Sequence, residues 1–369
     1  MFKNARKICS LSKALVDKKT IGYLILFVTA RCNLRCRMCF YWQETKKSNS
    51  SSELSLKEIS KISQNIHQLI HLTLTGGEPF FRDDITAIAR YFFDNSQLQS
   101  LTIATNGFFS AKIEKAAQEL ASAYPDKQIR ICLSIDGIGQ LHDQTRGVKG
   151  AFDKVIETHN RLIQIRKKYP NLVVDVNTVF SSFNQNQIIT IIKHVNGNFK
   201  FNNHYVSLVR GSAREPIAKK VNLQKYKQAI NLIEKQAINR QRQNITISLF
   251  WALKLAIRDI VYRTALEKKK IAPCLAGQKM IEITESGKVL CCEILGKSMG
   301  NLRKVNYDIN KLMSSPRAKK ILKEIKDNDC FCHFECAIQT GVAYSPFFYP
   351  KVAKYILKSF FDTHEKKKN

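Results

Sequence analysis

Residues 32–40 read Cys32-Asn-Leu-Arg-Cys36-Arg-Met-Cys39-Phe40 and follow directly on the apolar, β-favouring run Leu24–Thr29. Three thiolates on one loop can hold three irons of a cubane iron–sulfur cluster and leave its fourth iron open. A structural zinc ion is the alternative, but it needs a fourth protein ligand nearby, and no further cysteine continues the run. The stretch therefore indicates a cluster-binding loop at the end of a strand.

Strand and helix patterns alternate from this loop through the first two thirds of the chain. The expected strands are Leu24–Thr29, Leu72–Thr75, Leu101–Ala104, Ile129–Ile135, Val173–Val179 and Tyr205–Val209. The expected helices are Leu56–Ile70, Ile85–Phe93, Ala111–Ala123, Phe152–Arg166 and Ile188–Val195. Such β-α repeats predict an α/β fold, with a parallel sheet or barrel and helices outside it.

The unusual motifs stand where the expected strands end. Thr75-Gly76-Gly77-Glu78-Pro79 follows the second strand, Thr105-Asn106-Gly107 the third, and Ser134-Ile135-Asp136-Gly137 closes the fourth. Ligands bind at the carboxyl edge of parallel sheets, so these segments predict an active site at that edge. His142, Asp143 and Arg146 come next, in what we interpret as a polar loop open to substrate or solvent.

A second group of cysteines lies near the C-terminus. The chain has 11 cysteines, an odd number, and is long enough to bury a core without disulfides. Clustered cysteines in a chain without an export signal favour metal ligation. The C-terminal cysteines are Cys274, Cys291, Cys292, Cys330, Cys332 and Cys336. Glu285-Ser-Gly-Lys288 between them is typical of a hairpin turn.

The cysteine loop resembles the signature of the radical S-adenosylmethionine (radical SAM) superfamily, and Gly76-Gly77-Glu78-Pro79 is similar to that family's Gly-Gly-Glu-Pro motif. The resemblance implies a partial (β/α)6 TIM-type barrel over residues 20–212. It also implies a [4Fe-4S] cluster on Cys32, Cys36 and Cys39. The residues implied in binding SAM are Gly76, Gly77, Glu78, Ser134 and Asp136.

The C-terminal cysteines resemble a SPASM/twitch extension, in which a Gly-x4-Cys hairpin helps to hold an auxiliary cluster. Gly287-x4-Cys292 matches, so Cys292 is preferred to Cys291. The full SPASM set has further cysteines and two clusters, whereas none follows Cys336 here. One auxiliary [4Fe-4S] cluster is implied, with zinc as the alternative. Its implied ligands are Cys274, Cys292 and two of Cys330, Cys332 and Cys336.

The remaining organisation is a short N-terminal segment over residues 1–19, a helical connector over 213–270, the auxiliary module over 271–340 and a basic tail over 341–369. No stretch approaches the roughly 20 apolar residues of a membrane span, and no secretory signal is evident, so we expect a cytoplasmic protein without an integral span. The formal charge of +30 would attract an acidic partner or an anionic surface.

The resemblance implies an enzyme that reductively cleaves SAM to a 5′-deoxyadenosyl radical, which takes hydrogen from a substrate. A reductant such as flavodoxin or ferredoxin is implied as partner. A ribosomally made peptide is the expected substrate, because SPASM-type extensions often accompany one. The alternatives are a sugar, glycan or small metabolite, then nucleic acid. A non-catalytic iron–sulfur electron-transfer protein is the rival from another class, although cluster carriage alone would not require Gly76–Pro79.

Overall fold

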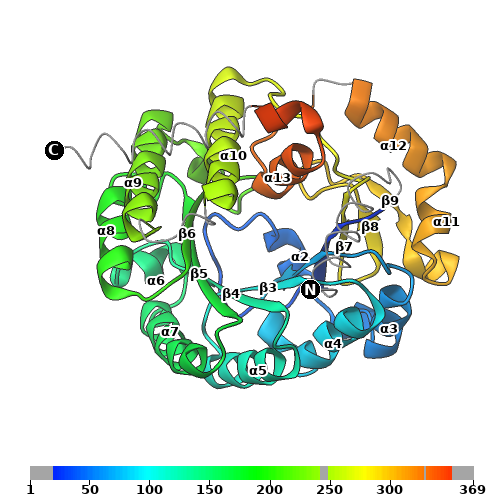
Figure 1. Cartoon of the computed structure of the whole chain (residues 1–369), viewed down its shortest axis with the longest axis horizontal. Helices are drawn as coiled ribbons and strands as arrows, with labels where there is room; N and C mark the ends of the chain where they lie inside the picture. Colours follow the sequence, from blue (N-terminus) through cyan, green and yellow to red (C-terminus); the bar gives the residue numbers. More distant parts are fainter. Residues whose placement is uncertain (1–19, 242–247, 328–329, 351–369) are drawn as a thin grey trace.

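The computed structural model describes residues 20–241, 248–327 and 330–350. Its centre is a curved sheet in which six parallel strands follow one another in chain order (Figure 1). Their bounds are Tyr23–Thr29 (β1), His71–Gly76 (β2), Ser100–Thr105 (β3), Gln128–Ser134 (β4), Leu172–Phe180 (β5) and Asn203–Leu208 (β6). The α/β fold with a parallel, barrel-type sheet is thus confirmed.

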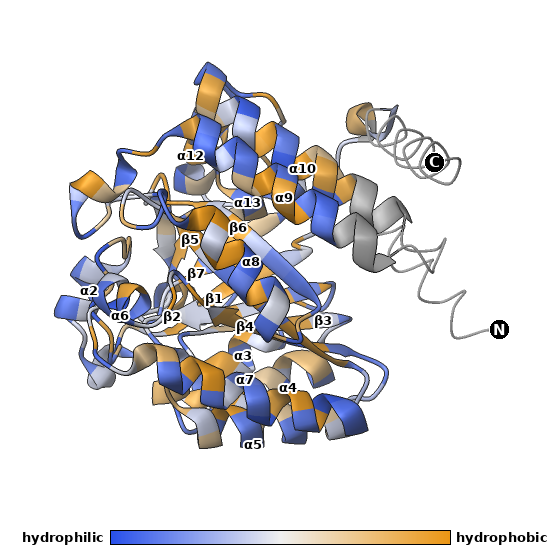
Figure 2. Cartoon of the chain, turned by 90° about the vertical axis from the view of Figure 1, so that its left-hand side faces the viewer, coloured by the Kyte–Doolittle hydropathy of each residue, from blue (hydrophilic) through white to orange (hydrophobic). Residues whose placement is uncertain are grey.

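Helices cover the outer face of this sheet (Figure 1). They are Leu56–Ser63 (α3), Ile85–Asn95 (α4), Ser110–Ala123 (α5), Ala151–Lys168 (α7) and Ile188–Asn198 (α8). Hydrophobic and hydrophilic segments alternate along α4, α5 and α7 (Figure 2), as in helices that bury one face. The outward side chains of the strands, such as Leu72, Leu101 and Ile131, are fully buried beneath them.

Helix α3 is shorter than the helix predicted over Leu56–Ile70. A capping box of Ser55 and Glu58 starts it, but it ends at Ser63. Asn65 then turns back, and its side-chain amide donates to the Lys61 carbonyl oxygen over 2.9 Å. Ile66 and Leu69 remain buried in the turn that follows. The apolar spacing therefore marked core residues correctly but overstated the length of the helix.

The cysteine-rich segment continues the same sheet. Strand β7 (Met280–Ile283) pairs in parallel with β1, and β8 (Lys288–Leu290) and β9 (Ser298–Asn301) add antiparallel strands beyond it. The predicted turn lies between β7 and β8, where Gly287 has a φ of +79°. The segment that carries Cys274, Cys291 and Cys292 is therefore tied to β1 through the backbone hydrogen bonds of β7.

Three further helices close the side of the barrel next to β6. Helices α9 (Leu223–Gln241), α10 (Ser248–Glu267) and α13 (Glu335–Ala343) share an apolar cluster with β5, α8 and β6. Helices α11 (Ile309–Met313) and α12 (Pro316–Asp327) lie beside β9 (Figure 1). Among the described residues, no helix combines the length and apolarity needed to cross a membrane. Residues 1–19 and 351–369, which include much of the basic tail, lie outside the described residues.

The inner face of the curved sheet, here called the bore, is polar. His71 on β2 lies 3.4 Å from the hydroxyls of both Thr73 and Thr102, and Arg130 on β4 pairs with Asp175 on β5. Strand alternation places these side chains opposite the apolar ones under the helices. A buried polar surface of this kind suits a ligand with many hydrogen-bonding groups.

Candidate active site

The cysteine loop is held in place at the carboxyl end of β1. Leu34 and Met38 are buried beneath it, and the Leu34 amide donates to the Cys32 sulfur over 3.4 Å. The backbone amides of Arg35 and Arg37 donate to the carbonyls of Arg146 and Thr145 over 3.1 and 3.0 Å. The loop is thus fastened to the segment after β4, on the far side of two intervening strands.

The chemistry of the three sulfurs fits a cluster. Cys32, Cys36 and Cys39 are free thiols that all lie on this loop. Burial raises the pKa of Cys32 to about 12 and that of Cys39 to about 11, and it also raises the pKa of Cys36. Buried thiolates therefore need compensating positive charge, which the irons of a cluster supply when bound. The donor set fits a site-differentiated [4Fe-4S] cluster.

The Gly76-Gly77 segment touches the cysteine loop at backbone level. A Cβ on Gly77 would lie 2.1 Å from the Arg31 carbonyl oxygen, and Gly76 has a φ of +128°. The amides of Gly77 and Glu78 donate to the carbonyls of Thr29 and Arg31, each over 2.8 Å. Only glycine allows the two chain segments to approach this closely. They form a cradle beside the cluster loop.

Glu78 is only 1% exposed and crosses from this cradle to the end of β3. Its carboxylate accepts hydrogen bonds from the Thr105 hydroxyl and the Asn106 amide, each over 2.7 Å, and from the Phe80 amide over 3.2 Å. Burial raises its pKa to about 7, although these hydrogen bonds favour the ionised form. An ionised carboxylate has roughly four acceptor sites, so one remains for a ligand.

Ser134 and Asp136 occupy different environments at the end of β4. Ser134 is half-buried, whereas Asp136 is fully buried. Asp136 accepts from the Val179 amide over 2.7 Å, and its other carboxylate oxygen lies 2.5 Å from the Arg146 guanidinium. Asp136 is therefore engaged by protein groups on both sides.

The interpretation of His142, Asp143 and Arg146 as a polar loop is wrong. They lie on a short helix, Gln140–Arg146 (α6), which buries His142 and Arg146 completely or nearly so. Asp143 accepts from the amides of Gly150 and Phe152, which anchors α6 to α7. Gly139 and Gly147 bracket the segment with positive φ angles, and these helix-end glycines were the sequence signal that could have revealed it.

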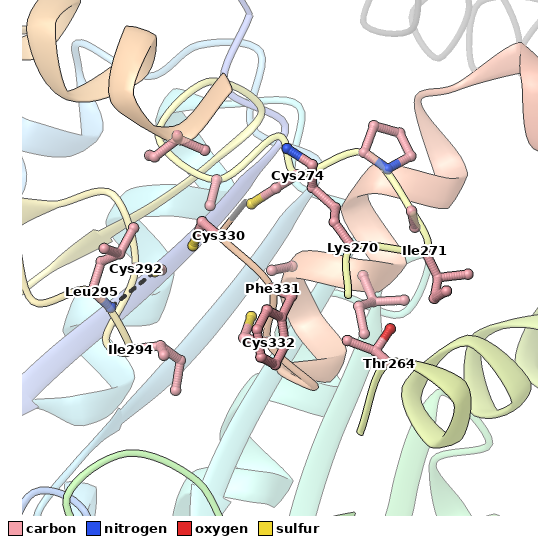
Figure 3. Close-up of a pocket in the computed structure, with 16 residues that line it drawn as sticks. Thr264, Lys270, Ile271, Cys274, Cys292, Ile294, Leu295, Cys330, Phe331 and Cys332 are labelled. Atoms are coloured by element: carbon pink, nitrogen blue, oxygen red, sulfur yellow. Dashed lines mark hydrogen bonds between the residues drawn. The ribbon is translucent and has the colours of Figure 1, made fainter. Parts of the chain in front are cut away.

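Four C-terminal cysteines come together around one cavity (Figure 3). Cys274, Cys292, Cys330 and Cys332 all line it, together with residues from the ends of α10, α12 and α13. The Leu295 amide donates to the Cys292 sulfur over 3.4 Å. Burial raises the pKa of Cys332 to about 12, so this group also lacks compensating positive charge. Four converging thiols in a sulfur-lined cavity fit a fully ligated cluster.

Cys336 lies elsewhere, at the bore. The Tyr23 hydroxyl of β1 donates to its sulfur over 3.4 Å, and the Arg210 charge lies nearby. Arg210, which follows β6, pairs with Glu293 and stacks against Phe40 and Phe334. It thereby links the cysteine loop to the C-terminal segment. Within the described parts of the chain, no three Cys, His, Asp or Glu side chains surround a single-ion position.

Comparisons with known proteins agree with this arrangement. The model of the radical SAM superfamily matches residues 26–195. A GTP 3′,8-cyclase of Campylobacter jejuni subsp. doylei is 27% identical over 237 residues, which are 60% of this chain and 69% of that protein. A GTP 3′,8-cyclase of Haemophilus influenzae is 32% identical over 148 residues, 38% of this chain and 44% of that protein.

Two solved structures share the fold over most of the chain. Native anSMEcpe with bound AdoMet superimposes with a TM-score of 0.58 at 16% identity and covers 91% of this chain and 99% of its own. Streptococcus suis SuiB bound to the precursor peptide SuiA gives a TM-score of 0.57 at 17% identity and covers 86% of this chain and 70% of its own.

The family match spans the cysteine loop, the glycine cradle and the strands that carry them. Residues 26–195 are therefore a radical SAM domain, which makes the protein an enzyme whose cofactors are a [4Fe-4S] cluster and S-adenosylmethionine.

Proposed function

We propose that this enzyme takes a hydrogen atom from a ribosomally made peptide, with Cys32, Cys36 and Cys39 holding the cluster to which SAM binds. The observation that carries the proposal is the contact between the cysteine loop and the Gly76–Glu78 cradle at the polar bore. When bound, the cluster and SAM supply the reductive cleavage that generates a 5′-deoxyadenosyl radical.

The protein's own residues bind and orient the reactants. The remaining acceptor site of Glu78 receives the ammonium group of SAM, and the backbone of Gly76 and Gly77 leaves space for its amino-acid end. Ser134, at the rim of β4, is the second expected contact with SAM. The apolar residues beneath the loop, Leu34 and Met38, help to exclude water from the site.

We infer an auxiliary [4Fe-4S] cluster on Cys274, Cys292, Cys330 and Cys332, which selects Cys330 and Cys332 from the three candidates at the end of the module. Their shared cavity supports this set, and the separation of Cys336 at Tyr23 supports its exclusion. The cluster would exchange electrons with the substrate or with a reductant. A cytoplasmic flavodoxin or ferredoxin is the reductant we propose.

A peptide is favoured as substrate because two fold neighbours that extend over most of this chain, anSMEcpe and SuiB, are described with bound peptides. The polar groups of the bore suit the amide groups of such a chain. A nucleotide is the second candidate, favoured by the sequence similarity to GTP 3′,8-cyclases and by the charge of +30.

Isotope transfer tests the substrate class. The full chain, reconstituted anaerobically with iron and sulfide, is given SAM, dithionite and either deuterated precursor peptides or deuterated GTP. We expect deuterium in 5′-deoxyadenosine and a mass change in the substrate only with peptide. Deuterium transfer from GTP alone would show that the substrate is a nucleotide and not a peptide. Deuterium transfer from neither would contradict both substrate classes.

Glu78→Gln should weaken SAM binding about 10- to 100-fold, because it removes a charge-assisted hydrogen bond of roughly 1.5–3 kcal/mol. The pKa of about 7 adds a pH dependence: the wild type should bind SAM more tightly as the pH rises through 7 and the carboxyl ionises. The variant should show no such rise. Anaerobic equilibrium dialysis, about one unit below and above pH 7, measures both effects.

Glu119→Gln is the matched control, since Glu119 lies on the outer helix α5 and pairs only with the exposed Lys115 among the described residues. It should bind SAM as the wild type does. Equal affinity and an equal pH profile for Glu78→Gln and the wild type would remove Glu78 from the SAM site.

A further inference from the structure

A buried arginine lies against one of the three cluster-loop sulfurs. Arg146 at the end of α6 has a side chain that is 10% exposed, and its Nη1 donates to the Cys36 Sγ over 3.7 Å. Its Nη2 lies 2.5 Å from Oδ2 of the fully buried Asp136. The guanidinium therefore stands between a sulfur and a carboxylate, out of contact with bulk water.

The position of this guanidinium is fixed from two directions. The backbone of α6 accepts from the amides of Arg35 and Arg37 on either side of Cys36. On the other side, the Asp136 carboxylate is held by the Val179 amide over 2.7 Å, and the Asp136 amide donates to the buried His142 ring over 3.2 Å. The distance from Arg146 to the Cys36 sulfur is therefore set by the fold rather than by a free rotamer.

The charges of Arg146 and Asp136 act on the sulfur with opposite sign. The positive guanidinium of Arg146 lies directly against the Cys36 sulfur, whereas the negative carboxylate of Asp136 lies on the other side of that guanidinium. Adding an electron to a cluster adds a negative charge in the same place. A nearby buried cation favours that reduced state, and a nearby anion opposes it.

We propose that Arg146 and Asp136 are positioning residues that set the reduction potential of the cluster on Cys36, Arg146 raising the potential and Asp136 lowering it. This rests on the proposed function, which assigns the cluster to Cys32, Cys36 and Cys39. It gives Asp136 a part in tuning the cluster through Arg146 instead of direct contact with SAM. Hydrogen bonds to cluster sulfurs and local net charge are the means by which proteins tune such potentials.

The test is a redox titration of the reconstituted full chain without SAM or substrate, monitored by the electron paramagnetic resonance signal that is lost when Cys32, Cys36 and Cys39 are all replaced by alanine. Arg146→Met should shift the midpoint to a more negative potential, and Arg146→Lys, which keeps the charge, should shift it less. Asp136→Asn should shift it to a more positive potential, because it removes the negative charge. The side-chain amide oxygen of this variant can still accept from the Val179 amide, so the local structure should persist. The double variant should fall between the two single ones.

Arg130→Met is the matched control, because it removes a buried arginine from another aspartate pair, between β4 and β5, without touching the cluster loop. Its midpoint should equal that of the wild type. Each titration is read on protein whose iron content shows a loaded cluster. If Arg146→Met loses the cluster, the inference is tested by Asp136→Asn alone, whose midpoint should shift to a more positive potential.

An unmoved midpoint in loaded Arg146→Met, or an unmoved or more negative midpoint in Asp136→Asn, would overturn this inference and leave the proposed function intact. A wild-type chain that takes up no cluster would instead overturn the proposed function, and this inference with it.

Discussion

Alanine at Cys32, Cys36 and Cys39 should reduce the formation of 5′-deoxyadenosine from SAM to the level seen without enzyme. The expected loss is complete, because these three sulfurs are the proposed protein ligands of the cluster whose open fourth iron binds SAM. The measurement uses dithionite as reductant and no substrate, so that it reports on SAM cleavage alone. Iron content should fall from about eight to about four per chain, because each [4Fe-4S] site contributes four irons.

Cys132→Ala is the matched control for this experiment. Cys132 is a free thiol in the middle of β4, and neither the cluster loop nor the C-terminal cavity contains it. Its loss should change neither iron content nor SAM cleavage. If the triple variant still forms 5′-deoxyadenosine at the wild-type rate, the assignment of Cys32, Cys36 and Cys39 is wrong.

The second large effect concerns Cys274, Cys292, Cys330 and Cys332. Replacing Cys274 and Cys292 with alanine should lower iron content from about eight to about four and abolish substrate turnover. Cleavage of SAM without substrate should persist at least in part, because the cysteine loop and its cradle lie at the ends of β1 and β2, outside the C-terminal cavity. Iron analysis and the substrate-free assay separate the two sites.

Single alanine variants of Cys330, Cys332 and Cys336 distinguish the ligands within that module. Loss of Cys330 or Cys332 should remove the auxiliary cluster, whereas Cys336→Ala should retain about eight irons, since Cys336 lies at Tyr23 and not in the cavity. If Cys336→Ala loses about four irons and Cys332→Ala keeps about eight, then Cys336 is the cluster ligand and Cys332 is not. Unchanged iron content in the Cys274/Cys292 variant would remove the auxiliary site altogether.

The local patterns of the sequence were sufficient for the barrel. Leu24–Thr29 and the five later strands have the apolar character that burial on both faces or beneath helices requires, and the helices between them bury one face each. The cysteine loop and the glycine cradle were also readable, because each is a short segment whose spacing or backbone geometry determines what it can hold. These properties depend on near neighbours in the chain.

Other features depend on residues far apart in the chain, and only the tertiary structure decided them. The proposed choice of Cys330 and Cys332 over Cys336 rests on the cavity that the first two share and on the position of Cys336 at Tyr23 of β1. The sequence alone predicts a solvated Arg146. In the folded chain, backbone hydrogen bonds from Arg35 and Arg37 hold α6 against the cysteine loop and thereby bury this arginine. Residue spacing along the chain is enough to predict a loop or a turn. The surroundings of a buried charge such as Arg146 come from residues distant in the sequence, which approach it only when the sheet has formed.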